Sequence, residues 1–426
     1  MAETPTPAAT PTPAESPPVA LYLHIPFCVS HCPYCDFVVV AGREARGPAN
    51  RIAAFVDALE AELHLRADAL DARWAGPASR PPLESLYFGG GTPSLLPAST
   101  IERLVELVRR RFGLAPDAEV SVEVNPGVDE RGDARAQRDA GVTRLSIGAQ
   151  SFDSRELRSL GRRHSPEDIG ATVAAAKCAG IPSISLDLLY DIPGSSLASW
   201  SATLDDALRL APDHLSLYAL TLDDPDAEGL TGAGGDHLPV RPGARRWRNR
   251  ARADQDDDRA AAMYELADAR LGAAGLDWYE ISNWSRDGHR SRHNLAYWQR
   301  RPYEAVGPGA HAFDGVTRRW NAARLDGYLA ALAPPDGGRP KLPPGGRERV
   351  VGADARAESA ILALRTSDGL RDVSGERSAV EWAEDRLREP IAAGLVKRND
   401  GRFVLTPRGR LLSNEVFAVL LPAPTG

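Results

Sequence analysis

Strand-like and helix-like segments alternate along residues 20–222, and this alternation constrains the fold more than any other feature of the chain. Short apolar runs are followed, in turn, by segments whose apolar residues recur at helical spacing. The expected strands are 21–25, 85–88, 120–124, 144–147, 184–189 and 214–217. Strands that alternate with helices at this interval form a parallel sheet with right-handed crossovers. Six such units predict an α/β fold with an open, partial (β/α)6 barrel.

Helix signals between these strands support the pattern. Apolar residues recur on one face between Ile52 and Leu63. Ser99 and Glu102 match a capping box at the start of a second helix. Gly113 suits the end of that helix, because glycine readily adopts the left-handed conformation found there.

Polar and special residues gather at the C-terminal ends of the expected strands. They are a cysteine-rich loop, a glycine run at 89–91, Glu123, Gln150, Asp187 and Tyr218. Active sites of α/β barrels are built at this edge. The clustering therefore predicts a functional site there, independently of any motif.

Three of the four cysteines, Cys28, Cys32 and Cys35, fall within eight residues. Such tight clustering points to metal binding and not to a disulfide framework. Three thiolates can hold three irons of a [4Fe–4S] cluster and leave the fourth iron open to another ligand. The alternative is a structural zinc site completed by His24 or His31. We expect Cys178, in a helical stretch, to be a buried apolar residue.

Composition narrows the classes of function. The net charge of −7 argues against a protein that coats nucleic acid or anionic lipid, so no nucleic-acid partner is expected. No apolar run approaches the ~20 residues of a membrane helix. Residues 1–19, rich in Pro, Thr and Ala, predict a disordered tail with no secretory signal, and hence a cytoplasmic location.

The chain beyond the expected barrel, 20–225, divides into two further parts. Residues 226–345 hold a charged stretch at 231–258, expected to be a solvated surface loop, then a helix, an aromatic-rich stretch and a Pro/Gly linker. Residues 346–426 combine helices with two short strands joined at Asn399-Asp400-Gly401. This combination predicts a C-terminal domain of winged-helix type.

The cysteine spacing Cx3Cx2C, with Tyr34 before the third cysteine, resembles the signature of the radical SAM superfamily. Further short sequence motifs resemble those of one branch of this superfamily, which contains oxygen-independent coproporphyrinogen III oxidases and the HemW heme chaperones. These motifs are YLHIPFC at 22–28, CPYCDF at 32–37, GGGTPS at 89–94, EVNPG at 123–127, SIGAQSF at 146–152 and LDL at 186–188. The resemblance covers roughly residues 20 to 422.

Within that branch the chain is more similar to the heme chaperones. Phe37 stands where the oxidases carry a further cysteine, the N-terminal tail is short, and residues 293–298 match the HNxxYW motif of the chaperones. The resemblance implies binding of heme and its transfer to an unidentified apo-hemoprotein. The alternative is anaerobic oxidative decarboxylation of coproporphyrinogen III in porphyrin biosynthesis. Whether the chain acts as an enzyme stays open.

The resemblance also implies roles for individual residues. Cys28, Cys32 and Cys35 would hold the cluster, and S-adenosylmethionine would bind its open iron. The S-adenosylmethionine contacts would come from Tyr22, Tyr34, Gly90, Gly91, Thr92, Glu123, Gln150, Arg162 and Asp187. For these polar residues the alternative is a structural hydrogen bond at the barrel edge.

His293 is the implied heme ligand, because a neutral imidazole is a good axial ligand and Tyr297 and Trp298 would flank the porphyrin. His311 is the second candidate. The alternative for His293 is a histidine with its hydrogen bonds satisfied in an aromatic core. A homodimer and a peripheral contact with membrane hemoproteins stay open.

Overall fold

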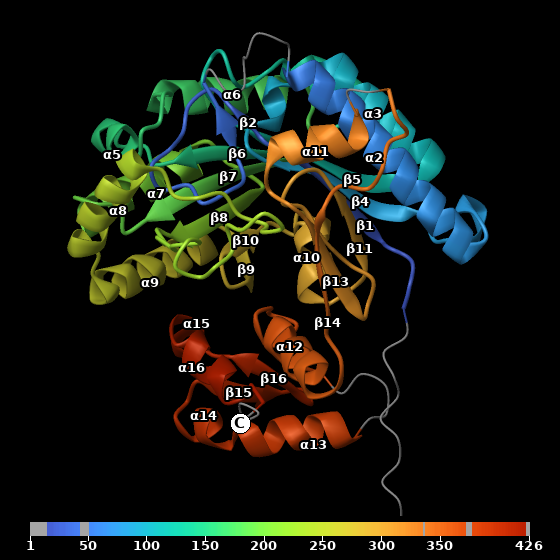
Figure 1. Ribbon diagram of the computed structural model, residues 1–426. Coiled ribbons are helices and arrows are strands. Elements are labelled where there is room, and N and C mark those ends of the chain that lie inside the picture. Colours follow the sequence, from blue (N-terminus) through green and yellow to red (C-terminus); the bar gives the residue numbers. More distant parts are fainter. Residues whose placement is uncertain (1–14, 43–50, 335–336, 372–376, 423–426) are drawn as a thin grey trace, which may run out of the picture.

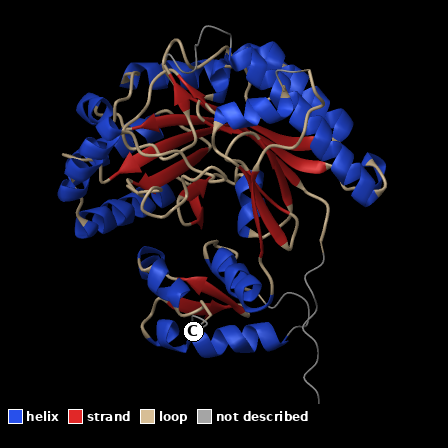
Figure 2. Cartoon of the chain, viewed as in Figure 1, coloured by secondary structure: helices blue, strands red, loops and turns tan. Residues whose placement is uncertain are grey.

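The computed structural model describes residues 15–42, 51–334, 337–371 and 377–422. A strongly curved sheet is covered on its outer side by helices, and a smaller C-terminal domain lies beside it (Figures 1 and 2). The expected disordered tail falls mostly on residues outside the described ranges. Its last residues are tied down, since the Val19 amide donates to the Pro302 carbonyl at 3.0 Å.

The six central strands of the sheet are parallel and follow one another in chain order. They are β1 Ala20–Ile25, β4 Leu83–Gly90, β5 Leu114–Val124, β6 Arg144–Gln150, β7 Ser183–Tyr190 and β8 His214–Ala219. The predicted α/β fold with a partial six-unit barrel is therefore confirmed. The face of these strands that the helices cover is apolar, with Leu86, Phe88 and Val122 among its residues. The face toward the barrel interior carries buried polar side chains instead, such as those of Ser85, Ser121 and Ser146.

Six more strands from residues 277–349 extend this sheet, and the sequence did not predict them. On one side β11 pairs in parallel with β1 and is followed by β12, β13 and β14; on the other, β10 and β9 follow β8. Their bounds are β9 Asp277–Glu280, β10 Asn283–Ser285, β11 Tyr303–Val306, β12 His311–Phe313, β13 Thr317–Asn321 and β14 Gly345–Arg349. The aromatic-rich stretch therefore belongs to the same sheet as the barrel.

Helices follow most strands and bury one face against the sheet. They are α2 Arg51–Trp74, α3 Ala98–Arg111, α4 Ala134–Asp139, α5 Ser154–Ser159, α6 Pro166–Cys178, α7 Leu197–Arg209, α8 Pro242–Asp254, α9 Asp257–Ala273, α10 Arg292–Trp298 and α11 Leu325–Leu332. Two short 3-10 turns, η1 Pro77–Ser79 and η2 Pro93–Leu95, lie between them. None of the helices in the described ranges has the length and apolar content needed to cross a membrane.

Of three local predictions, two were wrong and one was confirmed. Helix α3 begins after Pro97 without a side-chain cap, so Ser99 and Glu102 form no capping box. Cys178, at the end of α6, is exposed because it lies on the outer face of that helix. Gly113 does end α3 with a φ of 78°, as predicted.

The charged stretch 231–258 is not a solvated loop throughout, because α8 spans Pro242–Asp254. The helix was not predicted because its buried face carries Ala251 and the guanidinium of Arg248 in place of large apolar residues. Trp247 packs beside them against an apolar cluster under the barrel edge.

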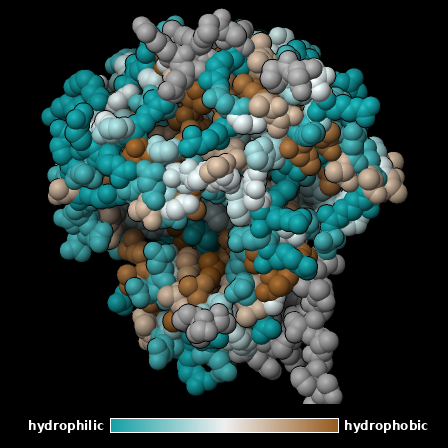
Figure 3. All heavy atoms as spheres, in the orientation of Figure 1, coloured by the Kyte–Doolittle hydropathy of each residue, from teal (hydrophilic) through white to brown (hydrophobic). Residues whose placement is uncertain are grey.

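The C-terminal domain has its own apolar core. Its elements are α12 Gly352–Leu364, α13 Arg377–Arg386, α14 Arg388–Ala392, β15 Val396–Asn399, β16 Arg402–Leu405, α15 Pro407–Leu411 and α16 Ser413–Ala418. The predicted hairpin is confirmed, with Asp400 and Gly401 at positive φ in the turn. In the space-filling view, brown apolar areas are visible on this domain and also among the hydrophilic surface of the sheet domain (Figure 3).

Candidate functional site

The cysteine loop leaves the barrel directly after β1. Two short strands, β2 Phe27–Cys28 and β3 Val40–Ala41, pair in parallel at its base. The Val40 amide donates to the Pro26 carbonyl at 2.6 Å and closes the loop. Cys28, Cys32 and Cys35 are all partly exposed on it. Local backbone pairing therefore holds the three thiols at the C-terminal edge of the sheet.

The glycine run after β4 docks onto the base of this loop. The Gly91 amide donates to the Ile25 carbonyl at 2.8 Å, and the Thr92 amide donates to the Phe27 carbonyl at 2.7 Å. A Cβ on Gly91 would lie 2.6 Å from the Phe27 carbonyl oxygen. Only glycine permits this approach, so the GGGT run and the cysteine loop form one unit.

Two polar side chains reach the thiols. The Thr92 hydroxyl donates to Cys28 Sγ at 3.5 Å, and Arg162 Nη1 lies 3.7 Å from Cys32 Sγ. Burial raises the pKa of Cys28 to about 11 and also raises the pKa of Cys35. Neighbouring thiols whose pKa values are raised ionise together only when a cation neutralises them, as iron does. The donor set therefore fits a [4Fe–4S] cluster.

Asn125, at the end of β5, links these two side chains, and the sequence did not single it out. Its amide nitrogen donates to the Thr92 hydroxyl at 3.0 Å and to Glu130 Oε2 at 2.8 Å. Its carbonyl oxygen accepts from Arg162, which also donates to the Gly148 carbonyl at 2.9 Å. Asn125 thereby fixes both groups that face the thiols.

Arg248 of α8 holds the cysteine loop from the other side. Its guanidinium donates to the carbonyl oxygens of Pro33 at 3.1 Å, Tyr34 at 2.8 Å and Asp223 at 2.6 Å. Arg248 is buried. The sequence missed this contact because 215 residues separate Arg248 from Pro33. The Tyr34 ring packs against the same apolar cluster as Trp247 of this helix.

Glu123, at the end of β5, receives two hydrogen bonds. The Gly90 amide donates to Oε2 at 2.8 Å and the Tyr87 hydroxyl to Oε1 at 3.0 Å. Burial, with a contribution from nearby Asp187, raises the pKa of Glu123 to about 7. The carboxyl is suited to receive hydrogen bonds from ligand hydroxyls such as those of a ribose.

Asp187 and Gln150 lie on neighbouring strands. Asp187 accepts from the Ser146 hydroxyl at 2.9 Å and the Ser185 hydroxyl at 3.2 Å, while burial raises its pKa. Gln150, at the end of β6, has a φ of 66°. That backbone strain in a non-glycine residue is typical of binding sites. Asp187 thus has its hydrogen bonds within the barrel, whereas Gln150 lies at its edge.

Tyr22 and His24 lie on β1 between the cysteine loop and the barrel interior. The Tyr22 hydroxyl is hydrogen-bonded to His24 Nδ1 at 3.0 Å, and His24 Nε2 donates to the Val38 carbonyl at 2.8 Å. Both ring nitrogens of His24 are therefore engaged and leave none for zinc. No group of three or more His, Cys, Asp or Glu side chains in the described ranges is arranged to hold a single metal ion.

A cavity of about 430 Å³ opens beside the cysteine loop. Its lining includes Gly90 and Glu123, together with residues from the segments 236–237 and 309–311. Its remaining lining residues are Tyr22, His24, Asp36, Phe37, Val38, Tyr297 and Tyr303. Phe37 is 59% exposed. The cavity thus joins the predicted S-adenosylmethionine residues to an aromatic surface.

His293, the first residue of the HNxxYW motif, is buried behind that surface. Its Nδ1 lies 2.9 Å from the Ser85 hydroxyl and its Nε2 lies 2.7 Å from the Tyr297 hydroxyl. Its ring lies among those of Tyr22, Tyr87 and Tyr297. Burial lowers its pKa to about 3, so the imidazole is neutral. Iron could reach Nε2 only after Tyr297 moves.

His311, the second histidine candidate, begins β12 and lines the cavity. Its Nε2 lies 2.8 Å from Asp236 Oδ2, and its ring stacks on Trp320. Burial lowers its pKa. The structure therefore places His311 at the cavity, with its Nε2 already paired with the Asp236 carboxylate.

Comparisons with known proteins agree with this architecture. Residues 22–207 match the family model described as Radical SAM superfamily, and residues 352–412 match the HemN C-terminal domain. Coproporphyrinogen III oxidase from Escherichia coli, described as a radical SAM enzyme, superimposes with a TM-score of 0.74 at 24% identity over 95% of this chain and 90% of that one. The fold and the cysteine loop thus define a radical SAM protein.

Curated relatives identify the branch. The heme chaperone HemW of Mycobacterium tuberculosis is 40% identical over 95% of both chains. The heme chaperone HemW of Synechocystis is 33% identical over 95% of this chain and 97% of its own. The chain therefore belongs to the HemW family of the radical SAM superfamily, and the predicted resemblance is confirmed.

Proposed function

We propose that this chain is a heme chaperone, which binds heme and transfers it to an apo-hemoprotein. The observation that carries the proposal is the 40% identity, over nearly the whole length of both chains, to a relative named heme chaperone HemW. An aromatic-lined cavity next to the cysteine loop supports it, because flat porphyrins bind between aromatic and apolar side chains.

The proposal includes a [4Fe–4S] cluster held by Cys28, Cys32 and Cys35, with S-adenosylmethionine on its open iron. A bound, reduced cluster supplies one-electron chemistry to that cofactor. The close packing of the GGGT run on the cysteine loop supports this assignment. Arg162 orients the loop through Cys32 and would face the carboxylate of the cofactor, to which a guanidinium can fork.

The remaining S-adenosylmethionine contacts are proposed at the same edge. Glu123 and Asp187 would accept from ribose hydroxyls. The residues Tyr22, Tyr34, Gly90, Gly91, Thr92 and Gln150 would line the cofactor, as the resemblance implies.

The second candidate function is anaerobic oxidation of coproporphyrinogen III. The similarity of fold to the E. coli oxidase over 95% of the chain favours it. Phe37 counts against it, because this exposed phenylalanine stands where the resemblance implies that the oxidases have a cysteine. Loss of that thiol removes a group able to take part in redox or metal chemistry.

One experiment separates the two functions. The protein is reconstituted anaerobically with iron and sulfide, and one half is titrated with heme. The other half is incubated with reductant, S-adenosylmethionine and coproporphyrinogen III. A chaperone binds heme and passes it to an apo-hemoprotein without forming protoporphyrinogen IX. Protoporphyrinogen IX formation without heme uptake would establish the oxidase and refute the proposal.

The partner expected from this proposal is an apo-hemoprotein in the cytoplasm or at the inner face of a membrane. The transfer assay addresses it directly: heme-loaded protein is mixed with a candidate acceptor and separated from it, and heme is measured in each fraction. Size-exclusion chromatography of the same samples tests the homodimer.

A further inference from the structure

Two tight turns meet at the wall of the cavity. In the first, the Gly235 amide donates to the Gly232 carbonyl at 3.0 Å and the His237 amide donates to the Leu230 carbonyl at 3.2 Å. A Cβ on Gly235 would lie 2.1 Å from the Leu230 carbonyl oxygen. This compact turn is held in place and carries Asp236 and His237 to the cavity.

The first turn is anchored to the sheet. The Trp320 indole donates to the Gly234 carbonyl at 3.2 Å, and the Ala323 amide donates to the Gly235 carbonyl at 2.9 Å. These bonds fix the Asp236–His237 pair relative to β13, which carries Trp320.

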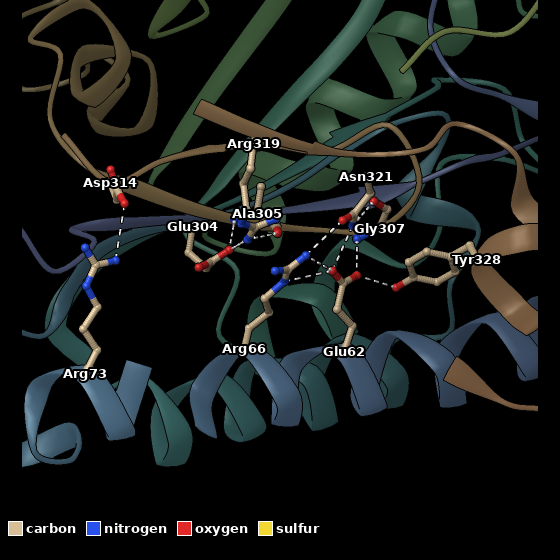
Figure 4. Close-up of polar contacts among 10 residues, drawn as sticks. All are labelled: Glu62, Arg66, Arg73, Glu304, Ala305, Gly307, Asp314, Arg319, Asn321 and Tyr328. Carbon is tan, nitrogen blue, oxygen red and sulfur yellow. Dashed lines mark hydrogen bonds and ion pairs between the residues drawn. The ribbon is translucent and has the colours of Figure 1, made fainter. Parts of the chain in front are cut away.

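The second turn, 307–311, is anchored from below by α2. The Glu62 carboxylate accepts from the Gly307 amide at 2.9 Å, from Asn321 at 2.8 Å and from the Tyr328 hydroxyl at 2.8 Å. Figure 4 shows Glu62 and Arg66 pointing from the helix toward these partners. A Cβ on Gly309 would lie 3.1 Å from the Asp236 carbonyl oxygen, so the two turns touch.

Asp236 joins two histidines from these turns. Its Oδ1 lies 3.0 Å from His237 Nδ1, and its Oδ2 lies 2.8 Å from His311 Nε2. His237 Nε2 makes no hydrogen bond within the described part of the chain, and its ring lines the cavity. An imidazole that donates Nδ1–H to a carboxylate and leaves Nε2 for iron is the usual arrangement of a metal-bound histidine.

Aromatic and apolar side chains share the cavity with this imidazole. Tyr22, Tyr297, Tyr303, Phe37 and Val38 line the same cavity. The three charged or imidazole groups are not arranged around a common point for a bare metal ion, since both imidazoles are directed at the carboxylate between them. The combination suits an iron that brings its own planar, apolar ligand.

We propose that His237 is the axial ligand of heme iron, with Asp236 as a positioning residue that orients its ring and His311 as a second partner that holds Asp236. This inference rests on the proposed heme-binding function and identifies where the iron binds. It differs from the assignment to His293, whose Nδ1 and Nε2 are both hydrogen-bonded in the barrel interior.

The test compares heme with metal-free protoporphyrin IX, which needs the pocket but no axial ligand. Cluster-reconstituted wild type, His237→Ala, His237→Met, Asp236→Asn and His293→Ala are titrated with both. His237→Ala is expected to lower heme affinity at least about tenfold and to leave protoporphyrin IX affinity unchanged. His237→Met is expected to replace the histidine-ligated electron paramagnetic resonance signal of ferric heme with a different one. Added imidazole should restore the original signal in His237→Ala.

Asp236→Asn is expected to keep heme bound, with an altered iron–histidine vibration and an affinity lowered by about tenfold. The matched control is His64→Ala, which removes an exposed histidine on α2, on a different element from the cavity. Heme spectra and affinities of His237→Ala and His237→Met equal to those of the wild type overturn the inference while leaving the proposed function intact. Failure of the wild type to bind heme overturns both.

Discussion

The Arg248 guanidinium donates a 2.8 Å hydrogen bond to the carbonyl oxygen of Tyr34, inside the cysteine motif. A helix more than 200 residues away in the chain therefore shapes the loop that would hold the cluster. The same guanidinium contacts Pro33, so two successive backbone carbonyls depend on it. Arg248 lies in a segment that the sequence predicted to be a solvated loop.

Replacing this residue by Arg248→Met keeps most of the buried volume and removes the three donated hydrogen bonds. Each buried carbonyl left without a partner costs about 1–3 kcal/mol. We expect the cysteine loop to loosen and the reconstituted protein to hold less iron and sulfide per chain. Chemical iron and sulfide analysis after desalting measures the loss.

The control for this prediction is Arg250→Met on the same helix, because Arg250 is exposed. Its iron and sulfide content should equal that of the wild type. Equal cluster content in both variants would show that Arg248 does not shape the loop.

Gly91→Ala tests the close approach between the glycine run and the cysteine loop. The new methyl group would lie 2.6 Å from the Phe27 carbonyl oxygen, and backbone cannot yield as a side chain can. Overpacking of this kind costs about 1–3 kcal/mol. We expect a lower melting temperature and loss of cluster binding. Gly243→Ala, in open space on α8, should lower neither, so a wild-type cluster content in Gly91→Ala would contradict the prediction.

Local patterns predicted the parallel strands and the cysteine loop well. Each strand can be recognised from a short apolar run of a few residues, and parallel strands bring their C-terminal ends to one edge of the sheet. Glu123 and Asp187 were therefore located from the sequence, because each lies at or near a strand end in a short apolar run.

Contacts made over long distances in the chain were not predictable in this way. Strand β11 joins the sheet beside β1, and their first paired residues, Ala20 and Tyr303, are 283 positions apart in the chain. Nothing in the sequence of Tyr303–Val306 indicates this partner. Helix α8 was missed because Arg248 occupies its buried face, and an arginine is tolerated there only when carbonyls elsewhere accept its hydrogen bonds. The Asp236–His237 pair was also missed because its contacts are distant in the chain: they come from residues 307–311.

Glu62→Ala tests the network that anchors the second turn. Glu62 is fully buried and pairs with Arg66 at 3.1 Å. Removing one member of a buried pair leaves an uncompensated charge, at a cost of about 3–5 kcal/mol. We expect a loss of this size in denaturant unfolding. Glu106→Ala, which breaks an exposed ion pair on α3, should change the free energy of unfolding by less than about 1 kcal/mol. Comparable values for the two variants would show that the network is not stabilising.

Glu280 predicts a pH dependence at the junction with the C-terminal domain. Burial raises its pKa to about 7, against the lowering influence of the Ser282 amide and Arg365. In the unfolded chain a glutamate titrates near 4.3, so the folded state binds more protons between about pH 4.3 and 7. The contribution of this group to stability is therefore fully present below about pH 4.3 and is lost as the pH rises through about 7.

Glu280→Gln removes this titration. Relative to the wild type, the variant should become progressively more stable between pH 5 and 8, by up to about 3 kcal/mol. Urea unfolding at several pH values measures the difference, with exposed Glu415→Gln as control. A difference between Glu280→Gln and wild type that stays constant with pH would contradict the raised pKa.

Tyr297→Phe separates the two histidines as heme ligands. The substitution keeps the aromatic ring in the cavity wall and removes only the hydroxyl bound to His293 Nε2 at 2.7 Å. If His293 bound iron, freeing its Nε2 would raise heme affinity. With His237 as the ligand, we expect the heme spectrum and affinity to stay as in the wild type. The free energy of unfolding should fall by about 1–3 kcal/mol, because a buried hydrogen bond is lost. Tighter heme binding in Tyr297→Phe, abolished in a Tyr297→Phe/His293→Ala double variant, would instead assign the iron to His293.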